Sequence, residues 1–381
     1  MHCDYFEAGR CRSCTLLGTP YAEQLEARQQ RAAALLDEVA PGIHWLQPAR
    51  SPSSQYRNKA KLVVGGRPGR PTLGILDERG RGVDLRRCGL YEPGLASVFD
   101  PLHRFVSALG LEPYDVRGRR GELKYLLVTH SPDGEQLVRF VLRSERHLTE
   151  LRSALPRLLH EVPSLRVVTA NLHPEHKAVL EGDVEVPLTR ETRLPMRVGD
   201  ATLLLGPRSF FQTNTVVAAE LYRQAARWIR DAAPRTVWDL YCGVGGFALH
   251  AAGPGRTVIG VETSAEAVEA ARAAATLRAD AVGPASAGTV TFEVGDATDT
   301  TRSPAPDLVV VNPPRRGIGT ALASWLDASP ASHVVYSSCN VESLVRDLAA
   351  MPSLRARTGR LFDRFPQTAH AEVAVLLERC A

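Results

Sequence analysis

One cysteine stands at the end of a predicted strand and could act as a nucleophile. Cys339 follows the apolar run Val334–Tyr336, which is typical of a buried strand. Two other strand ends, at 239–246 and 312–315, carry residues that suit a nucleotide-type cofactor. The carboxyl ends of parallel strands meet at one edge of a sheet, so we expect the thiol beside the cofactor, which suggests covalent catalysis. Taken alone, Cys339 would more often be a buried structural thiol.

The predicted cofactor site begins on the strand Thr236–Leu240. Asp239 is followed by Gly243-Val244-Gly245-Gly246, and Glu262 ends the next strand 23 residues after Asp239. Glycines allow the backbone to approach a ligand closely, and an acid at that distance can accept hydrogen bonds from ribose hydroxyls. These two features fit NAD as well as S-adenosylmethionine. However, the loop lacks Gly-x-Gly-x-x-Gly spacing, and its Asp-x-x-x-Gly-x-Gly order looks like a class I methyltransferase. Asp296 ends the third strand, and Thr263-x-x-Glu266 predicts a capping box.

The second strand end reads Asn312-Pro313-Pro314-Arg315. Amino-group methyltransferases usually place an aromatic residue after this motif, to stack on a flat target. Here Arg315 and Arg316 follow the prolines, so phosphate or carboxylate contacts are expected instead. Methylation of pyrimidine carbon 5 is the alternative, because a thiolate that adds at carbon 6 makes carbon 5 nucleophilic. A base must then remove the carbon 5 proton. His370 and Glu372, two apart, would face the same side of a strand and form a candidate pair.

Five motifs in order resemble those of the RNA uracil-C5 methyltransferase family. They are Phe210–Asn214, Asp239–Phe247, Asn312–Gly317, Ser337–Asn340 and His370-x-Glu372. The resemblance implies that Cys339 is the nucleophile and Glu372 the general base. It also implies S-adenosylmethionine contacts from Gln212, Tyr241, Glu262 and Asn312. Asn312 is often Asp in this family and Tyr241 often Phe. Since Asn cannot be an anionic partner, we assign Asn312 positioning and hydrogen bonding.

The N-terminal cysteines form a second candidate site. The chain has seven cysteines, an odd number that argues against a disulfide framework. Cys3, Cys11 and Cys14, with Cys88 far downstream, could hold zinc or an iron–sulfur cluster, or could be unrelated free thiols. With Tyr56–Lys59 and Gly121–Tyr125, this spacing is similar to the branch of the family that modifies 23S ribosomal RNA. That resemblance implies a [4Fe–4S] cluster on the four cysteines. The transfer RNA branch lacks them.

The periodicity predicts an α/β protein of two domains. Residues 1–205 hold a helix at 21–39 and then mostly strands, which indicates a strand-rich α+β domain carrying the iron–sulfur cluster and binding RNA. Residues 206–381 alternate short apolar strands with helices, which indicates a class I (Rossmann-like) methyltransferase domain with a parallel, doubly wound sheet. We place the boundary near 200–208. The stretch 281–289 is expected to be a surface loop.

The distribution of charge suggests where RNA binds. Residues 206–381 carry 17 Lys and Arg against 17 Asp and Glu, so the net charge of +4 comes from residues 1–205. Three basic clusters suit phosphate contacts. They are Arg57 with Lys59 and Lys61, then Arg117, Arg119, Arg120 and Lys124, and finally Arg139, Arg143 and Arg146.

The resemblance implies a specific 23S ribosomal RNA uridine as the substrate, flipped or in a loop so that its base can reach Cys339. We expect a monomer. We also expect a cytoplasmic location, since no apolar run is long enough to span a membrane and the N-terminus does not read as a secretion signal. Three alternative functions are compatible with the sequence. They are uracil-C5 methylation of another RNA such as transfer RNA, amino-group or cytosine methylation, and a cluster-bearing RNA-binding protein without turnover.

Overall fold

The computed structural model describes residues 1–177 and 179–380 and divides the chain into two compact units. The first unit comprises residues 1–15 and 53–194, and the second comprises 16–52 and everything from Pro195 onward. The division therefore differs from the expected one at 205/206. Residues 16–52 join the second unit because they carry a helix and a strand that are built into it, as described below.

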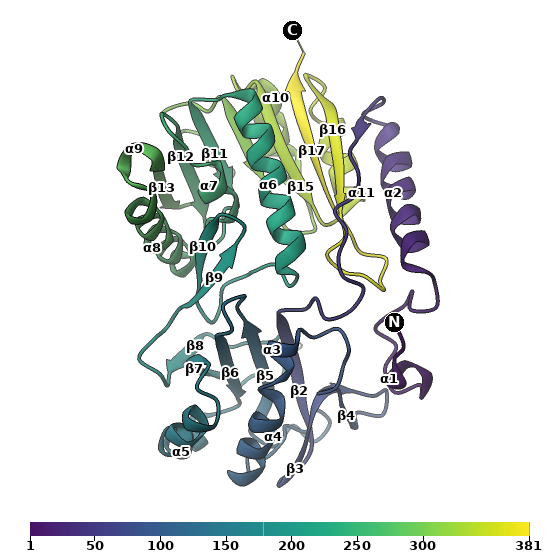
Figure 1. Cartoon of the computed structure of the whole chain (residues 1–381), viewed down its shortest axis with the longest axis vertical. Coiled ribbons are helices and arrows are strands. Elements are labelled where there is room, and N and C mark those ends of the chain that lie inside the picture. The colour runs from purple at the N-terminus through teal and green to yellow at the C-terminus, as the bar shows by residue number, and fades with distance from the viewer. Residues whose placement is uncertain (178, 381) are drawn as a thin grey trace. The chain divides into compact units, whose positions relative to one another are not determined.

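The second unit contains an eight-stranded sheet in the order β1-β16-β17-β15-β14-β11-β12-β13 (Figure 1). Its strands are β1 (His44–Trp45), β11 (Thr236–Leu240), β12 (Thr257–Glu262), β13 (Thr289–Val294), β14 (Leu308–Val311), β15 (His333–Ser338), β16 (Leu354–Phe362) and β17 (Glu372–Arg379). All neighbours pair in parallel except β17, which is antiparallel to both β15 and β16. The chain reverses direction across the sheet between β11 and β14, and this switch point opens a crevice at the carboxyl ends of the strands.

Helices cover both faces of this sheet, as predicted for a doubly wound α/β fold. The helices are α2 (Tyr21–Asp37), α6 (Thr215–Ala232), α7 (Gly246–Ala251), α8 (Ala265–Val282), α9 (Pro284–Ala287), α10 (Gly319–Ala328) and α11 (Val341–Ala349). Apolar side chains of α2, α10 and α11 share one core with β11, β14, β15 and β17. The α8 cap differs from the expected capping box, because the Ser264 side chain accepts the hydrogen bond from the Ala267 N–H. The short helix α9 also lies within the stretch expected to be a loop. A separate hairpin, β9 (Leu194–Val198) and β10 (Ala201–Leu205), precedes α6.

The first unit is a seven-stranded sheet in the order β4-β3-β2-β5-β6-β7-β8. Its strands are β2 (Lys59–Arg67), β3 (Arg70–Leu76), β4 (Gly82–Asp84), β5 (Leu123–His130), β6 (Gln136–Leu142), β7 (Leu165–Leu172) and β8 (Val184–Pro187). The helices α3 (Pro93–Ala96), α4 (Phe99–Ala108) and α5 (Leu148–Glu161) bury one face of the sheet in a second core. A short helix, α1 (Asp4–Glu7), begins the chain, and a 3₁₀ turn spans Glu145–His147. The strand-rich α+β character of this part was predicted.

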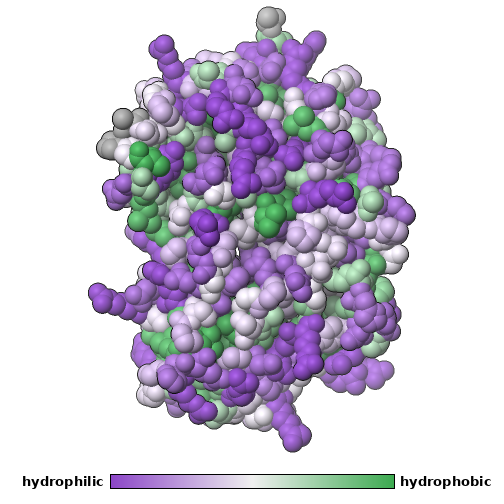
Figure 2. Space-filling view, viewed as in Figure 1, coloured by the Kyte–Doolittle hydropathy of each residue, from purple (hydrophilic) through white to green (hydrophobic). Residues whose placement is uncertain are grey.

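The surface is mainly polar. Figure 2 shows hydrophilic residues over most of the visible face, with apolar residues in small, separate groups. Among the described residues, no helix is both long and apolar enough to cross a membrane.

Candidate active site

A cavity of about 760 Å³ lies in the second unit, at the carboxyl ends of β11, β12, β14 and β15. It contains all six residues for which a catalytic or cofactor role was expected: Gln212, Tyr241, Glu262, Asn312, Cys339 and Glu372. The exposed aromatic residue Phe210 also lines it, as does the loop 312–318. Segments more than 150 residues apart in sequence therefore build one site.

The turn after β11 is shaped for close approach of a ligand. Gly243 and Gly245 have φ angles of +54° and +88°, and a Cβ on Gly245 would stand 2.8 Å from the Phe292 ring. Tyr241 holds a positive φ of +65°, which is uncommon for a residue with a side chain and is often found at functional sites. Glu262 supports the turn, since its Oε2 accepts a hydrogen bond from the Gly243 N–H (3.2 Å). This leaves open cavity space beside a carboxylate, which suits a ribose.

Asp239 lies beneath this turn and is fully buried. Its Oδ2 accepts a hydrogen bond from the Ala248 N–H at 2.8 Å, while Oδ1 has no hydrogen-bond partner among the described residues. Burial raises the pKa of Asp239 to about 8, with a smaller contribution from the nearby charge of Glu262. Asp239 is therefore mainly protonated at neutral pH and acts as a neutral support for the turn.

Cys339 occupies a tight turn between β15 and α11. The Ser338 Oγ donates to the Asn340 carbonyl (2.8 Å) and accepts from the Asn340 N–H (3.1 Å), which fixes the turn. Burial raises the pKa of the Cys339 thiol, and the charge of Glu372 adds to the effect. The guanidinium groups of Arg364 and Arg315 oppose it. The two arginines therefore favour the thiolate, which is the nucleophilic form.

Glu372 is the first residue of β17 and is 1% exposed. Its Oε1 accepts a hydrogen bond from the Ser337 hydroxyl, and its Oε2 accepts one from Arg364 Nη1, both at 2.5 Å. Ser338 of β15 pairs with Val373 of β17 in an antiparallel register. The next residue after Ser338 is Cys339, and the residue before Val373 is Glu372, so these two residues lie opposite each other. The thiol and the carboxylate are thus neighbours at one sheet edge. His370 is exposed and precedes the strand, so the expected same-face pairing of His370 with Glu372 is wrong.

The loop 312–318 is held by α11, a support that the sequence patterns did not reveal. Asn340 Nδ2 donates to the Arg315 carbonyl (3.1 Å), and Arg346 Nη2 donates to the Arg316 carbonyl (2.9 Å). The buried Asp347 carboxylate accepts from the Ile318 N–H (2.9 Å) and from the Tyr336 hydroxyl (2.5 Å). These contacts fix the turn that places Asn312 and Arg315 in the cavity wall.

Comparisons with known proteins agree with this arrangement. The family described as tRNA (Uracil-5-)-methyltransferase matches residues 196–380. The chain is 46% identical to the 23S rRNA (uracil(747)-C(5))-methyltransferase RlmC of Serratia proteamaculans, over 100% of both chains. It is also 46% identical to the protein of the same name from Cronobacter sakazakii, again over 100% of both. The chain belongs to the RNA uracil-C5 methyltransferase family.

A solved structure supports the fold assignment. The Pyrococcus abyssi tRNA (uracil-54, C5)-methyltransferase, solved with S-adenosyl-L-homocysteine, superposes with a TM-score of 0.80. The match covers 96% of this chain and 84% of the archaeal chain, at 24% sequence identity. The fold of an RNA uracil-C5 methyltransferase is therefore present over nearly the whole chain.

In this family member, α2 clamps the segment that leads into Glu372. The Arg28 guanidinium forms two hydrogen bonds to the Asp363 carboxylate, at 2.8 and 3.0 Å. Arg28 Nη1 also lies within 3.2–3.4 Å of the carbonyls of Phe365, Thr368 and His370. Both Arg28 and Asp363 are buried. A buried arginine on an amphipathic helix gave no signal in the sequence, because its acidic partner is 335 residues away.

The four cysteines expected to hold a cluster, Cys3, Cys11, Cys14 and Cys88, all belong to the first unit. Burial raises the pKa of Cys14 to about 11, and the charges of Cys88, Cys11 and Cys3 raise it further in that order. Within the described ranges, no three His, Cys, Asp or Glu side chains form a group able to hold a metal ion.

Two of the basic clusters are partly committed to internal contacts. Arg139 is 1% exposed and pairs with Glu181 and Glu185, so its expected contact with RNA is wrong. Lys124 is buried, and its Nζ donates to the Glu175 carbonyl at 2.6 Å. Arg117, Arg119 and Arg120 are exposed.

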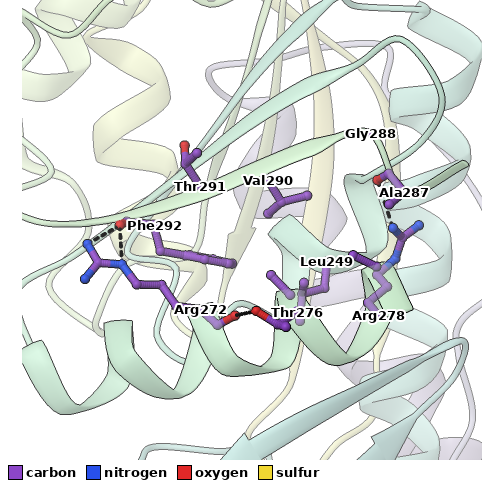
Figure 3. A pocket seen from close by; sticks show the side chains of 11 residues that line it. Leu249, Arg272, Thr276, Arg278, Ala287, Gly288, Val290, Thr291 and Phe292 are labelled. Carbon is purple, nitrogen blue, oxygen red and sulfur yellow. Dashed lines mark hydrogen bonds between the residues drawn. The ribbon is translucent and has the colours of Figure 1, made fainter. Parts of the chain in front are cut away.

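A second hollow, of about 510 Å³, lies between α8 and β13 (Figure 3). Arg272 donates to the Phe292 carbonyl, and Arg278 donates to the Ala287 carbonyl, as the dashed lines in Figure 3 mark. Its two cations therefore bind backbone oxygens, and its remaining lining is mainly aliphatic. This hollow offers no nucleophile or base.

Proposed function

We propose that this protein transfers a methyl group from S-adenosyl-L-methionine to carbon 5 of a uridine in 23S ribosomal RNA. The observation that supports the chemistry is the placement of Cys339 and Glu372 as neighbours in one cavity. The full-length relatives are named as 23S rRNA uracil-747 methyltransferases, which supports both the RNA and the equivalent uridine as the target.

Cys339 begins the reaction. Its thiolate forms a bond to carbon 6 of uracil, and the electrons of the carbon 5–carbon 6 double bond move into an enolate. S-adenosylmethionine, when bound, supplies an electrophilic methyl group on a sulfonium, and leaves as the neutral thioether once carbon 5 has taken that methyl group. Glu372 then removes the carbon 5 proton. The double bond forms again, and the carbon 6–sulfur bond breaks to return the Cys339 thiolate.

The cofactor contacts expected from the family fit the cavity. Glu262 is placed at the carboxyl end of β12, where its carboxylate would accept hydrogen bonds from the ribose. Tyr241 and Gln212 line the same cavity, and Asn312 stands at the end of β14. We assign Asn312 a positioning and hydrogen-bonding role, since an amide cannot accept the carbon 5 proton.

Trapping on RNA tests the mechanism. RNA with 5-fluorouridine at the target cannot lose a proton from carbon 5, so the wild-type protein with S-adenosylmethionine is expected to stay covalently attached. Cys339→Ala should form no adduct. Glu372→Gln should accumulate adduct on ordinary uridine RNA. Absence of any wild-type adduct on 23S ribosomal RNA fragments, or rapid normal turnover by Glu372→Gln, would contradict the proposal.

The substrate is tested separately. Methylated uridine is mapped at nucleotide resolution in ribosomal and transfer RNA from cells with and without this protein. We expect loss of one 5-methyluridine in 23S ribosomal RNA. Loss in transfer RNA, or of a methylated cytosine or amino group, would assign a different substrate.

We also propose that Cys3, Cys11, Cys14 and Cys88 hold a [4Fe–4S] cluster. The support is the Cys-x7-Cys-x2-Cys spacing with Cys88 in the same unit, which is similar to the family branch whose cysteines carry such a cluster. Burial, and after it the charges of Cys88, Cys11 and Cys3, raise the pKa of Cys14, and iron binding would favour its thiolate form. Anaerobic reconstitution should load iron and sulfide in equal amounts and give visible absorbance. Cys88→Ser should lose both, while Cys380→Ser, at a cysteine without an assigned role, should keep them.

The first unit is proposed to bind RNA through its exposed arginines. Arg117, Arg119 and Arg120 are exposed near the turn before β5, where they could contact phosphates. Large exposed apolar side chains are few and spread along the described chain, which supports a monomer. We propose a cytoplasmic location, because ribosomal RNA is the substrate.

A further inference from the structure

Three neighbouring strands end beside one another at the cavity. In the sheet order β16-β17-β15, the middle strand β17 begins with Glu372, and β15 ends just before Cys339. Phe362 ends β16 in register with Glu372, and Arg364 follows two residues later. The three cavity-lining side chains therefore come in the spatial order Cys339, Glu372, Arg364.

This order matches the order of atoms in the target ring. In the proposed function, on which this inference rests, Cys339 attacks carbon 6 and Glu372 removes the proton from carbon 5. The next ring atom along this edge is carbon 4, which carries the O4 carbonyl oxygen. The side chain next to Glu372 on the far side from Cys339 belongs to Arg364, which touches Glu372 through an Nη1–Oε2 hydrogen bond of 2.5 Å.

Charge moves to that oxygen during the reaction. When the thiolate adds at carbon 6, the electrons of the double bond pass through carbon 5 to carbon 4 and leave a negative charge on O4. A guanidinium held in a buried wall stabilises such an enolate more strongly than water does, because it needs no reorganisation. Arg364 is 5% exposed, and Glu372 is its only side-chain hydrogen-bond partner among the described residues. It therefore keeps donors for an oxygen.

We propose that Arg364 donates a hydrogen bond to O4 of the target uracil, stabilises the enolate, and excludes cytosine. Cytosine carries an amino group on carbon 4, whose N–H donors would face the guanidinium N–H donors without an acceptor. A site built to donate to a carbonyl discriminates strongly against such an analogue.

The experiment measures single-turnover formation of the covalent complex on 5-fluorouridine RNA with S-adenosylmethionine. This readout needs no removal of a carbon 5 proton, so it separates enolate stabilisation from any effect on Glu372. Arg364→Met should slow the step about 100-fold, as removal of one oxyanion donor does. RNA affinity should stay within about twofold, since the contact strengthens only as charge develops. Arg364→Lys, which keeps the charge, should recover part of the rate.

A matched control and a second substrate complete the test. Arg357→Met removes an exposed arginine of β16, the strand that leads to Arg364; Arg357 pairs with Glu378 outside the cavity, so the rate should stay unchanged. The preference for 5-fluorouridine over 5-fluorocytidine RNA should fall at least tenfold in Arg364→Met. If Arg364→Met does not fold, the same two measurements on Arg364→Lys test the proposal. Adduct formation by Arg364→Lys should then be slower than in wild type, and its preference for 5-fluorouridine over 5-fluorocytidine should be weaker.

The failures are distinguishable. If wild-type protein forms no adduct, the proposed function itself fails. If wild type forms the adduct and Arg364→Met forms it at the same rate with the same base preference, only the role of Arg364 is overturned. An adduct formed at the normal rate, followed by slow release on uridine RNA, would show that Arg364 acts only by orienting Glu372.

Discussion

The clamp between Arg28 and Asp363 gives a sharp prediction for stability and catalysis. Replacing Arg28 with Met removes two hydrogen bonds to a buried carboxylate and one donor shared by three carbonyls. Breaking one side of a buried ion pair leaves an uncompensated charge, which costs about 3–5 kcal/mol. We therefore expect the free energy of unfolding of the second unit to fall by about that amount.

The measurement is favourable because all four tryptophans of the chain lie in the second unit. Urea unfolding followed by tryptophan fluorescence therefore reports on this unit. Arg31→Met is the matched control, because Arg31 lies on the same helix but forms an exposed pair with Glu342. Such a pair contributes about 0–1 kcal/mol.

A double-mutant cycle with Asp363→Asn isolates the pair. The double variant should be less destabilised than the sum of the single variants, by about 1–3 kcal/mol. Turnover should also fall in Arg28→Met, because the segment 363–371 leads directly into Glu372, while binding of S-adenosylhomocysteine should be retained. Equal stability of Arg28→Met and Arg31→Met would refute the clamp.

Three further predictions follow from single residues. The rate of adduct formation on 5-fluorouridine RNA should rise with pH and level off above the ordinary pKa of a thiol, because burial raises the pKa of Cys339. Arg315→Met should move the midpoint of this pH–rate curve to higher pH, because the Arg315 charge lowers the pKa of Cys339. An unchanged midpoint would contradict the role of Arg315. The pKa of Asp239 is about 8 in the folded state and near 4 in the unfolded state, so the folded state binds an extra proton between pH 5 and 8. The free energy of unfolding should therefore fall by about 1.4 kcal/mol per pH unit over this range. Asp239→Asn should remove that slope in urea titrations, whereas the control Asp231→Asn, at an exposed position, should keep it. Gly317→Ala places a Cβ 2.2 Å from Asp347 Oδ2, so it should lower the melting temperature and slow turnover. The control Gly319→Ala has a similar φ but open space around the Cβ, so it should cost only about 1–2 kcal/mol of backbone strain. Equal effects of the two substitutions would refute the close-approach argument.

The sequence predicted the central strands closely because their signals are local. Thr236–Leu240 has the predicted bounds, since it is a short apolar run closed by a turn. Residues 16–52 were assigned to the other unit because their attachment consists of long-range contacts: α2 packs into the core of the second unit, β1 pairs with β16, and Arg28 binds Asp363, none of which periodicity detects. Arg139 was misread for a related reason. A charged residue on a strand looks exposed until its partner Glu185, on another strand, is known.

The candidate site shows the same division between local and distant information. Cys339 and Glu372 were identified from motifs, but their approach depends on the insertion of β17 between β15 and β16. A shift of one residue in the pairing of Ser338 with Val373 would turn Glu372 to the opposite face of the sheet, away from the thiol. This register is held by the pairing of β17 with β15 and β16, and the Arg28–Asp363 clamp holds the segment that enters β17. The helix α2 therefore helps to position Glu372 without lining the cavity, although it comes from the opposite end of the chain.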